Sequence, residues 1–143
     1  MLVSAAWLHD IGYAEELRET DCHPIDGARH LRRSGCDERV VNLVAHHSCA
    51  RVEASLRGLV SEFAEEFPRP AAEYEDALCY CDMTNGPAGM PVAAHERLDE
   101  IQERYGPMHV VTRFVEAARP EILEAVARVE GRLGFSESQG SVR

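Results

Sequence analysis

The sequence predicts an all-α fold made of a single domain. Apolar residues recur at intervals of three and four positions along most of the chain, which is the period of an amphipathic helix. No segment shows the strict alternation of a half-buried strand, and Pro and Gly residues separate stretches of helical length. The length of 143 residues suits one domain with one sizeable core. With 45% hydrophobic and 28% charged residues, the composition is that of an ordinary globular protein.

The first two helices are predicted from their apolar faces and from the residues at their ends. Residues 2–10 form an apolar helix, for which Gly12 is expected to be the C-terminal stop. His23 then stands at a helix N-terminus with Pro24 in the first turn, where the missing amide proton of proline costs nothing. This second helix carries apolar residues at helical spacing and is expected to end at Gly35.

Asp37 is expected to cap a third helix, because its carboxylate can accept hydrogen bonds from the first free amides. The residues that share the apolar face of this helix are Val40, Leu43, Val44 and His47. His46 lies at the edge of that face. Residues 55–66 form a weaker helical segment that is closed by Pro68 and Pro70.

The second half of the chain is also predicted to be helical. A helix over residues 71–84 is followed by the loop sequence NGPAGMP and then by a charged amphipathic helix over residues 94–105. The last helical region, residues 109–134, contains Pro120, which is expected to kink or split the helix after Ala118.

The charge and composition exclude some function classes. The net charge of -10 disfavours binding to duplex nucleic acid, because phosphate backbones are held by clustered positive charge. All fifteen basic residues are arginine, so no lysine can act as a base or form a Schiff base. No stretch is apolar enough for a membrane span and no secretion signal is recognisable, so we expect a cytoplasmic protein whose five cysteines are reduced.

Several polar residues that can bind metals are predicted to point inward. His9 and Asp10 follow each other at the end of the first apolar helix. A carboxylate there is unfavourable unless a cation is close by, because the last carbonyls of a helix are already negative. Asp82 follows Leu78 by one helical turn and is expected to face the core, where a carboxylate needs a partner.

Together these residues predict a metal site. The candidate ligands, which come from separate helices, are His9, Asp10, His23, His46, His47 and Asp82. Imidazole and carboxylate together suit one or two divalent transition metal ions, namely Mn, Fe, Co, Ni or Zn. Two ions about 3.5–4 Å apart could activate a water and clamp a phosphate. Each residue taken singly is more often structural, and capping, surface or core roles remain open for all of them.

Four segments of the chain, in order, resemble the HD-domain metal-dependent phosphohydrolases. They are AAWLHDIGY, HPIDGARHL, VVNLVAHHS and ALCYCDM, and the resemblance spans residues 2–85. The resemblance implies an all-helical HD-domain bundle in which His9, Asp10 and Asp82 are metal ligands. It further implies that His23, His46 and His47 supply a second metal or contact the phosphate. Tyr13 stands where the cyclic-dinucleotide phosphodiesterase branch has lysine, so that substrate is not expected.

The resemblance over residues 2–85 and the helical pattern of the remaining residues together predict the organisation of the chain. Residues 1–92 are expected to form the metal-binding helical core, residues 93–134 to be helices packed on this core, and residues 135–143 to be a flexible tail. The first histidine ligand of the family lies on a helix that precedes the His-Asp helix, and we expect this chain to begin after that helix. The apolar surface that such a helix covers would then be exposed, which leads us to expect a homodimer.

The leading hypothesis for function is a divalent-metal-dependent phosphohydrolase that acts on a small phosphorylated molecule, such as a nucleotide, through a metal-activated water. Asp10 is the expected catalytic and bridging ligand, and Arg51 is expected to bind the phosphate with its planar guanidinium, unless it is a solvated surface residue. One alternative is a catalytically silent HD-like helical domain that binds a metabolite or a protein partner. Another is a helical interaction protein whose inward histidines are satisfied by hydrogen bonds.

Overall fold

The computed structural model describes residues 1–134, which fold into eight α-helices. Three short turns of 3-10 helix lie in two of the connections between these helices. The α-helices are α1 (Leu2–Leu8), α2 (His23–Arg33), α3 (Glu38–His46), α4 (Ala50–Leu56), α5 (Val60–Glu66), α6 (Ala72–Met83), α7 (Ala94–Tyr105) and α8 (Val110–Leu133). The 3-10 turns are η1 (Ile11–Tyr13), η2 (Glu15–Leu17) and η3 (His47–Cys49). No strand forms among these residues, so the all-α prediction is confirmed. The predicted tail, residues 135–143, lies outside the described residues.

Two predicted helix ends are confirmed in atomic detail. The Asp37 side chain accepts a hydrogen bond from the backbone N–H of Arg39 at 2.8 Å, which caps α3. Gly35 has a φ of +78°, and the N–H of Cys36 donates to the carbonyl of Leu31 at 3.0 Å. This backbone pattern ends α2 and satisfies one of its free carbonyls.

The expected role of Gly12 as a helix stop is wrong. Helix α1 already ends at Leu8, and Gly12 lies inside η1, where it is buried. A Cβ atom at this position would lie 2.0 Å from the carbonyl oxygen of His23 and 2.6 Å from the backbone nitrogen of Gly27. Glycine is therefore needed because η1 packs directly on the backbone of α2, and any side chain would keep the two segments apart.

Two further helix predictions are corrected. Residues 55–66 are not one helix: they hold the last two residues of α4, a turn at Gly58 with a φ of +75°, and α5. Pro120 does not split the last helix, since α8 continues through it. Proline removes one backbone hydrogen bond, whereas Ala118 and Ile122 on either side of it are fully buried and hold the helix against the core.

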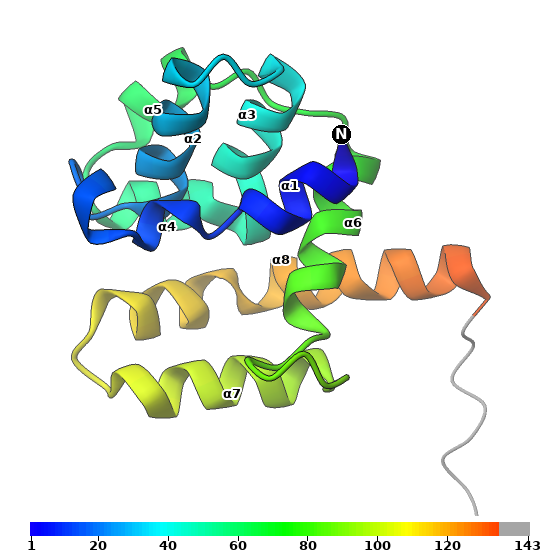
Figure 1. Ribbon diagram of the computed structural model, residues 1–143. Helices are drawn as coiled ribbons and strands as arrows, with labels where there is room; N and C mark the ends of the chain where they lie inside the picture. The colour runs from blue at the N-terminus through cyan, green and yellow to red at the C-terminus, as the bar shows by residue number, and fades with distance from the viewer. Residues whose placement is uncertain (135–143) are drawn as a thin grey trace, which may run out of the picture.

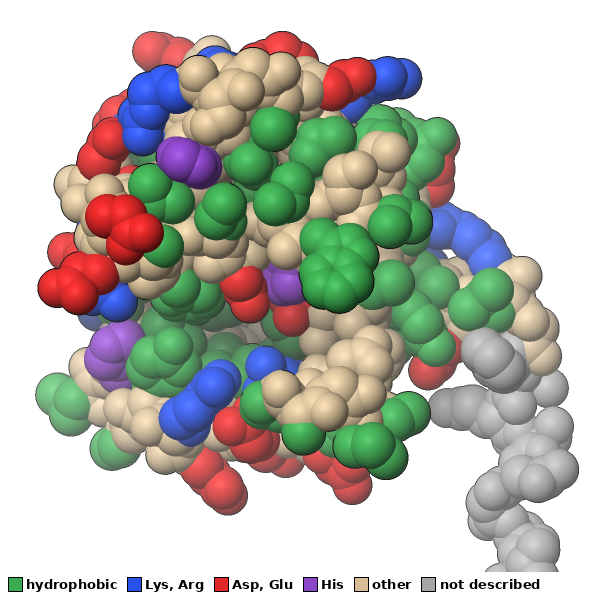
Figure 2. Space-filling model, in the orientation of Figure 1, with side chains coloured by type: hydrophobic (Ala, Val, Ile, Leu, Met, Phe, Trp, Pro, Cys, Tyr) green, Lys and Arg blue, Asp and Glu red, His purple; other side chains and the backbone are tan. Residues whose placement is uncertain are grey.

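The helices form two layers that share α6 (Figure 1). Helices α1 to α5 make up one layer, α7 and α8 run side by side in the other, and α6 passes from the first to the second. Leu78 of α6 belongs to the apolar cluster of the first layer, while Cys79 and Met83 belong to that of the second. The surface between the layers is hollowed (Figure 2), and the candidate site opens there.

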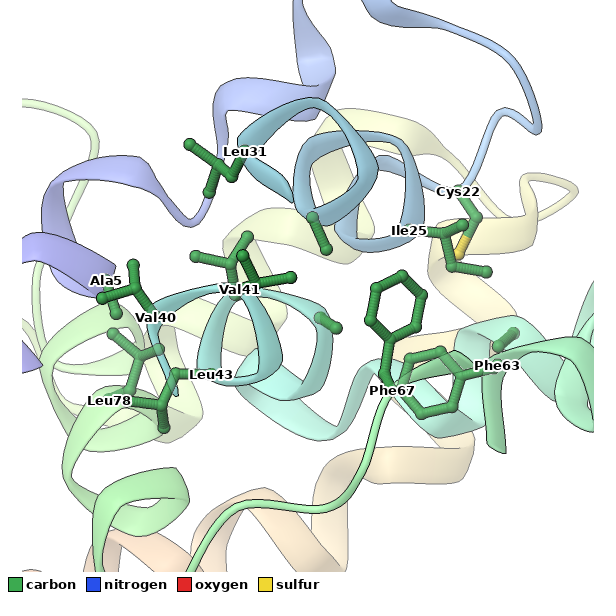
Figure 3. Packing of buried hydrophobic residues seen from close by; sticks show 14 residues of the cluster. Ala5, Cys22, Ile25, Leu31, Val40, Val41, Leu43, Phe63, Phe67 and Leu78 are labelled. Carbon is green, nitrogen blue, oxygen red and sulfur yellow. The ribbon is translucent and has the colours of Figure 1, made fainter. Parts of the chain in front are cut away.

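The first apolar cluster holds the helices that carry the site. Figure 3 shows the rings of Phe63 and Phe67 beside Ile25, with Val41 and Leu78 further along the same cluster. All five side chains are almost completely buried, and burying each of them stabilises the fold by about 1.5–3 kcal/mol. None of the helices in the described part of the chain is long and apolar enough to cross a membrane.

Candidate metal centre

His9 is oriented by the end of α1. It is the C-terminal cap residue of that helix, and its Nδ1 lies 2.8 Å from the carbonyl oxygen of Ala6. A carbonyl can only accept a hydrogen bond, so Nδ1 carries the proton and donates. This leaves Nε2 pointing toward Asp10 and Asp82, at 3.4 Å and 3.6 Å from their nearest carboxylate oxygens. Backbone bonds of this kind fix the ring orientation of histidine ligands in metal sites.

His47 is oriented in the same way by the end of α3. Its Nδ1 lies 2.6 Å from the carbonyl oxygen of Val44, and its Nε2 lies 3.1 Å from Nε2 of His23. The two residues that follow, Ser48 and Cys49, both have left-handed backbones with φ of 46° and 61°. Left-handed backbone is strained for residues other than glycine, and such strain clusters at functional sites. The turn lets His47 face inward while α4 starts in a new direction.

Asp10 lies between the histidines from three different segments. One carboxylate oxygen is 3.4 Å from Nε2 of His9, and the other is 3.5 Å from Nε2 of His23 and 3.8 Å from Nε2 of His47. The possible metal-binding group Asp10, His23 and His47 offers ligand atoms that all lie within 4.8 Å of one another. The two oxygens of Asp10 therefore face different histidines, with His9 on one oxygen and His23 and His47 on the other.

Asp82 is brought to the centre by α6 and held there by Ser48. The Ser48 hydroxyl donates to one carboxylate oxygen at 2.5 Å, while the other oxygen faces His9. Burial disfavours the charged form of Asp82, but His9, His47 and the Ser48 hydroxyl outweigh it and lower the pKa of Asp82 to about 2. The prediction that Asp82 faces the interior and needs a partner agrees with this position.

The three inward histidines differ in charge. Burial, together with the other histidines, lowers the pKa of His23 and of His47, so both are neutral near pH 7. Burial acts in the same direction on His9, but the Asp82 and Asp10 carboxylates outweigh it and raise the pKa of His9 to about 9. A divalent cation bound here would have to replace the proton of His9, because only an unprotonated ring nitrogen can be a ligand.

The residues present fit a transition metal. Nε2 of His9 is buried and makes no hydrogen bond within residues 1–134, although two carboxylates face it. A buried nitrogen without a partner costs free energy unless something binds it. The donors at the centre are imidazole nitrogens and carboxylate oxygens, a set that suits Mn, Fe, Co, Ni or Zn.

The structure does not bring His46 to this centre, although it was predicted as a ligand. Its ring is buried against Phe63, and its Nε2 lies 2.9 Å from the carbonyl oxygen of Phe67. His46 therefore ties the chain after α5 to α3. His46 and His47 are neighbours at the end of one helix, and consecutive residues of a helix point about 100° apart, so only one of them can face the cluster.

Arg51 also lies away from the centre, so its expected role as a phosphate-binding residue is corrected. It follows the left-handed turn, pairs with Glu121 at 3.4 Å and is half exposed. Together with His46 it borders a separate hollow of about 70 Å³. The turn at residues 48–49 has rotated α4 so that Arg51 faces α8.

Residues that were not predicted to belong to the site also surround the pocket at the centre. This pocket has a volume of about 280 Å³ and lies between the two layers. Besides the predicted ligands Asp10, His23, His47 and Asp82, its charged and aromatic lining includes Tyr13, Glu53, Arg97, Arg104, Tyr105 and Phe114. Figure 2 shows acidic and histidine side chains on one side of the hollow and arginine side chains on the other.

Two of these residues support His23 directly. The ring of Tyr13 stacks on that of His23 with centroids 3.9 Å apart. On its other side, Nδ1 of His23 lies 3.9 Å from the carboxylate of Glu53, which is buried and paired with Arg57 at 2.8 Å. The spacing of Glu53 and Arg57 by one helical turn was visible in the sequence, but nothing there linked the pair to His23.

The chain was compared with protein-family models, with curated proteins and with solved structures, and none of them matches.

Proposed function

We propose that the protein is a divalent-metal-dependent phosphohydrolase that acts on a small phosphorylated molecule, with nucleotides among the candidates. The single observation that carries the proposal is the buried Nε2 of His9, which has no hydrogen-bond partner in the described residues and faces two carboxylates. The resemblance of the ordered motifs to HD-domain phosphohydrolases supports the same proposal. His9, Asp10 and Asp82 would hold one ion, and His23 and His47 would complete the site for a second.

Each side chain has a definite part in this proposal. Asp10 would join the two donor sets, because its two oxygens already face different histidines. Ser48 positions Asp82 with its hydrogen bond, and the backbone carbonyls of Ala6 and Val44 keep the Nδ1 protons of their histidines away from the centre. A divalent ion bound there lowers the pKa of a water to near neutrality and stabilises negative charge that develops on a phosphate.

A second function is favoured by one observation. The raised pKa of His9, about 9, places a positive charge between the carboxylates of Asp10 and Asp82 without any metal. A cluster satisfied in this way fits a catalytically silent helical domain that binds a metabolite or a protein partner. The two proposals differ in whether phosphate esters are turned over.

The first experiment measures metal binding. Protein stripped with a chelator is titrated with Mn²⁺, Ni²⁺ and Zn²⁺ by calorimetry, and the metal content of protein purified without chelator is measured by elemental analysis. We expect one or two ions per chain, with release of protons because the ion displaces the proton of His9. Protein that neither retains nor takes up a metal would contradict the proposed function.

The second experiment separates ligands from ordinary surface carboxylates. We expect Asp10→Ala to abolish metal retention and phosphatase activity, tested on p-nitrophenyl phosphate and bis(p-nitrophenyl) phosphate. Asp99→Ala is the matched control, because the Asp99 side chain is 58% exposed, as is that of Asp10, and pairs with Arg119 away from the centre. An active and metal-replete Asp10→Ala variant would refute the assignment of Asp10. Metal binding without turnover of either compound would favour the silent domain.

A further inference from the structure

Helix α7 places an arginine opposite the candidate metal centre. Arg97 lines the same pocket as Asp10, His47 and Asp82, and its side chain is only 13% exposed. Its Nε is buried and has no hydrogen-bond partner within residues 1–134. A buried, charged N–H group without an acceptor is costly, and an acceptor bound in the adjoining pocket could relieve this cost.

A second arginine lies two helical turns further along the same helix. Arg104 follows Arg97 by seven positions, so both point to the same side of α7 and both line the pocket. Glu100 lies between them: it pairs with Arg97, and it is 3.4 Å from Nε of Arg104. One carboxylate thus orients two guanidinium groups and leaves a net positive charge on this wall. The guanidinium of Arg104 also lies over the ring of Tyr105 at 5.3 Å.

The two walls of the pocket have opposite charge. Asp10, which follows α1, and Asp82 at the end of α6 line one wall, and the arginines of α7 line the other, with a space of about 280 Å³ between them. An anion bound to the arginines alone would face the carboxylates, whereas an anion bound with a divalent ion on the carboxylates would be attracted by both walls. The charges on the two walls therefore suit an anion that binds the arginines and also coordinates a metal ion held by the carboxylates. The planar guanidinium group of arginine suits phosphate oxygens in particular.

We propose that Arg97, assisted by Arg104, binds the phosphoryl oxygens of the substrate, and that the substrate is a small phosphomonoester. This inference rests on the proposed function. A phosphomonoester has three free phosphoryl oxygens that can accept hydrogen bonds from both guanidinium groups and from the metal ion, whereas a phosphodiester has only two free oxygens and a single charge. The volume of the pocket, about 280 Å³, lies just below the roughly 300–1,000 Å³ of small-molecule sites, which also favours a small ligand.

The organic part of the substrate has a place beside the pocket. A second hollow of about 360 Å³ shares Tyr13, His23, Glu53, Tyr105 and Val111 with the first. Its remaining lining is mostly polar: Gly12, Arg18, Asp21, Asp26, Arg57, His109 and Val110. A polar group with several hydrogen-bonding atoms, such as a sugar, fits this lining better than an acyl chain does.

The test measures the binding of inorganic phosphate to the Mn²⁺-loaded protein by calorimetry, with dimethyl phosphate as the monoanionic comparison. We expect phosphate to bind, dimethyl phosphate to bind at least 10-fold more weakly, and both affinities to fall when the metal is removed. Arg97→Gln should weaken phosphate binding about 10-fold or more, as expected for the loss of a hydrogen-bonded charge. Arg97→Lys should weaken it less, because the charge stays while the fork is lost.

The controls separate a binding role from a structural one. Arg39→Gln is the matched control, because Arg39 is an exposed arginine paired with Asp37 at the start of α3. We expect it to bind phosphate like the wild type. All variants are checked for wild-type helicity and Mn²⁺ stoichiometry before phosphate is added, and Arg97→Lys keeps the test valid if Arg97→Gln does not fold.

Each outcome decides a different question. Full phosphate affinity in both Arg97 variants, with normal Mn²⁺ binding, would overturn the inference and leave the proposed function standing. Equal binding of phosphate and dimethyl phosphate would overturn the assignment of a phosphomonoester. Metal-dependent phosphate binding that needs Arg97, without turnover of any ester, would support the phosphate-binding role of Arg97 but would contradict the hydrolase and with it the assignment of a substrate. A wild-type chain that binds no Mn²⁺ would overturn both.

Discussion

The close contact at Gly12 makes a sharp prediction about how the site is assembled. Replacing this glycine with alanine adds one methyl group that would lie 2.0 Å from the carbonyl oxygen of His23 and 2.6 Å from the nitrogen of Gly27. Both neighbours are backbone atoms of α2, so no side chain can rotate to make room. Helix α2 must move away from η1, and His23 must move with it, away from Asp10.

The magnitude follows from the nature of the contact. Overpacking a core by a methylene group costs about 1–3 kcal/mol, and occasionally more, when side chains can adjust. Because the added methyl at Gly12 meets backbone, we expect a loss of about 3 kcal/mol or more in the free energy of unfolding, a large part of the 5–15 kcal/mol typical of a domain. The shift of His23 should also weaken Mn²⁺ binding at least 10-fold, because even the loss of a residue that only orients a metal ligand costs roughly 10–100-fold in affinity.

The assay compares this variant with alanine at another helical glycine. Urea unfolding followed by circular dichroism gives the free energy of unfolding for Gly12→Ala and for Gly131→Ala. Gly131 is exposed in α8, and a Cβ there meets nothing within 4 Å, so alanine should stabilise the fold by about 0.5–1 kcal/mol. The reasoning is refuted if Gly12→Ala unfolds at the wild-type urea concentration and binds Mn²⁺ normally, or if both variants lose equal stability.

Three other predictions concern the ion pair of α6, the support of the centre and the exposed face of α1. The carboxylate of Asp76 is buried and its pKa is lowered, first by hydrogen bonds from Arg128, so Asp76→Asn should cost about 1–2 kcal/mol at pH 7. The lowered pKa of Asp76 stabilises the fold only at a pH above the pKa of this carboxyl group in the unfolded chain. The difference in the free energy of unfolding between wild type and Asp76→Asn, measured in urea, should therefore shrink as the pH falls below about 4, and a constant difference would contradict this. Ser48→Ala removes the hydroxyl that donates a hydrogen bond to the carboxylate of Asp82 and should weaken Mn²⁺ binding about 10-fold in calorimetry. Unchanged Mn²⁺ affinity would mean that this hydrogen bond does not position Asp82. Trp7 on α1 is 86% exposed, and we expect the chain to form a homodimer through this face. Light scattering should report a dimer for the wild type, a monomer for Trp7→Ser, and a dimer for the control Met108→Ser, which changes another exposed apolar residue. A monomeric wild type at micromolar concentration would refute the homodimer.

The sequence predicted most of the helices because their signals are local. The cap at Asp37 and the left-handed Gly35 depend on residues within one turn of a helix end, and both appear as expected. The position of His9 and Asp10 at the end of an apolar helix is equally local, since it follows from the order of residues. Pro120 shows the limit of such signals, because packing on both sides of it holds α8 together despite the lost hydrogen bond.

The tertiary structure decided which of the predicted residues meet. Helical spacing shows that His46 and His47 cannot both face the cluster, but the structure decided their roles: Nε2 of His46 lies 2.9 Å from the carbonyl oxygen of Phe67, and His47 faces the centre. The left-handed turn at Ser48 sends Arg51 to the far side of α4, a change that no helical spacing encodes.

The sequence by itself determined that the chain is helical and which side chains could bind a metal, because period, caps and residue chemistry act over a few positions. Only the packing of the second layer decided that Arg97 and Arg104 face the centre, since they lie more than eighty positions beyond His9 and Asp10 along the chain. Gly12 makes the same point: its identity suggested a helix stop, but a backbone contact with α2 requires it. Contacts between distant segments depend on how whole helices pack, and that information is spread over the entire core.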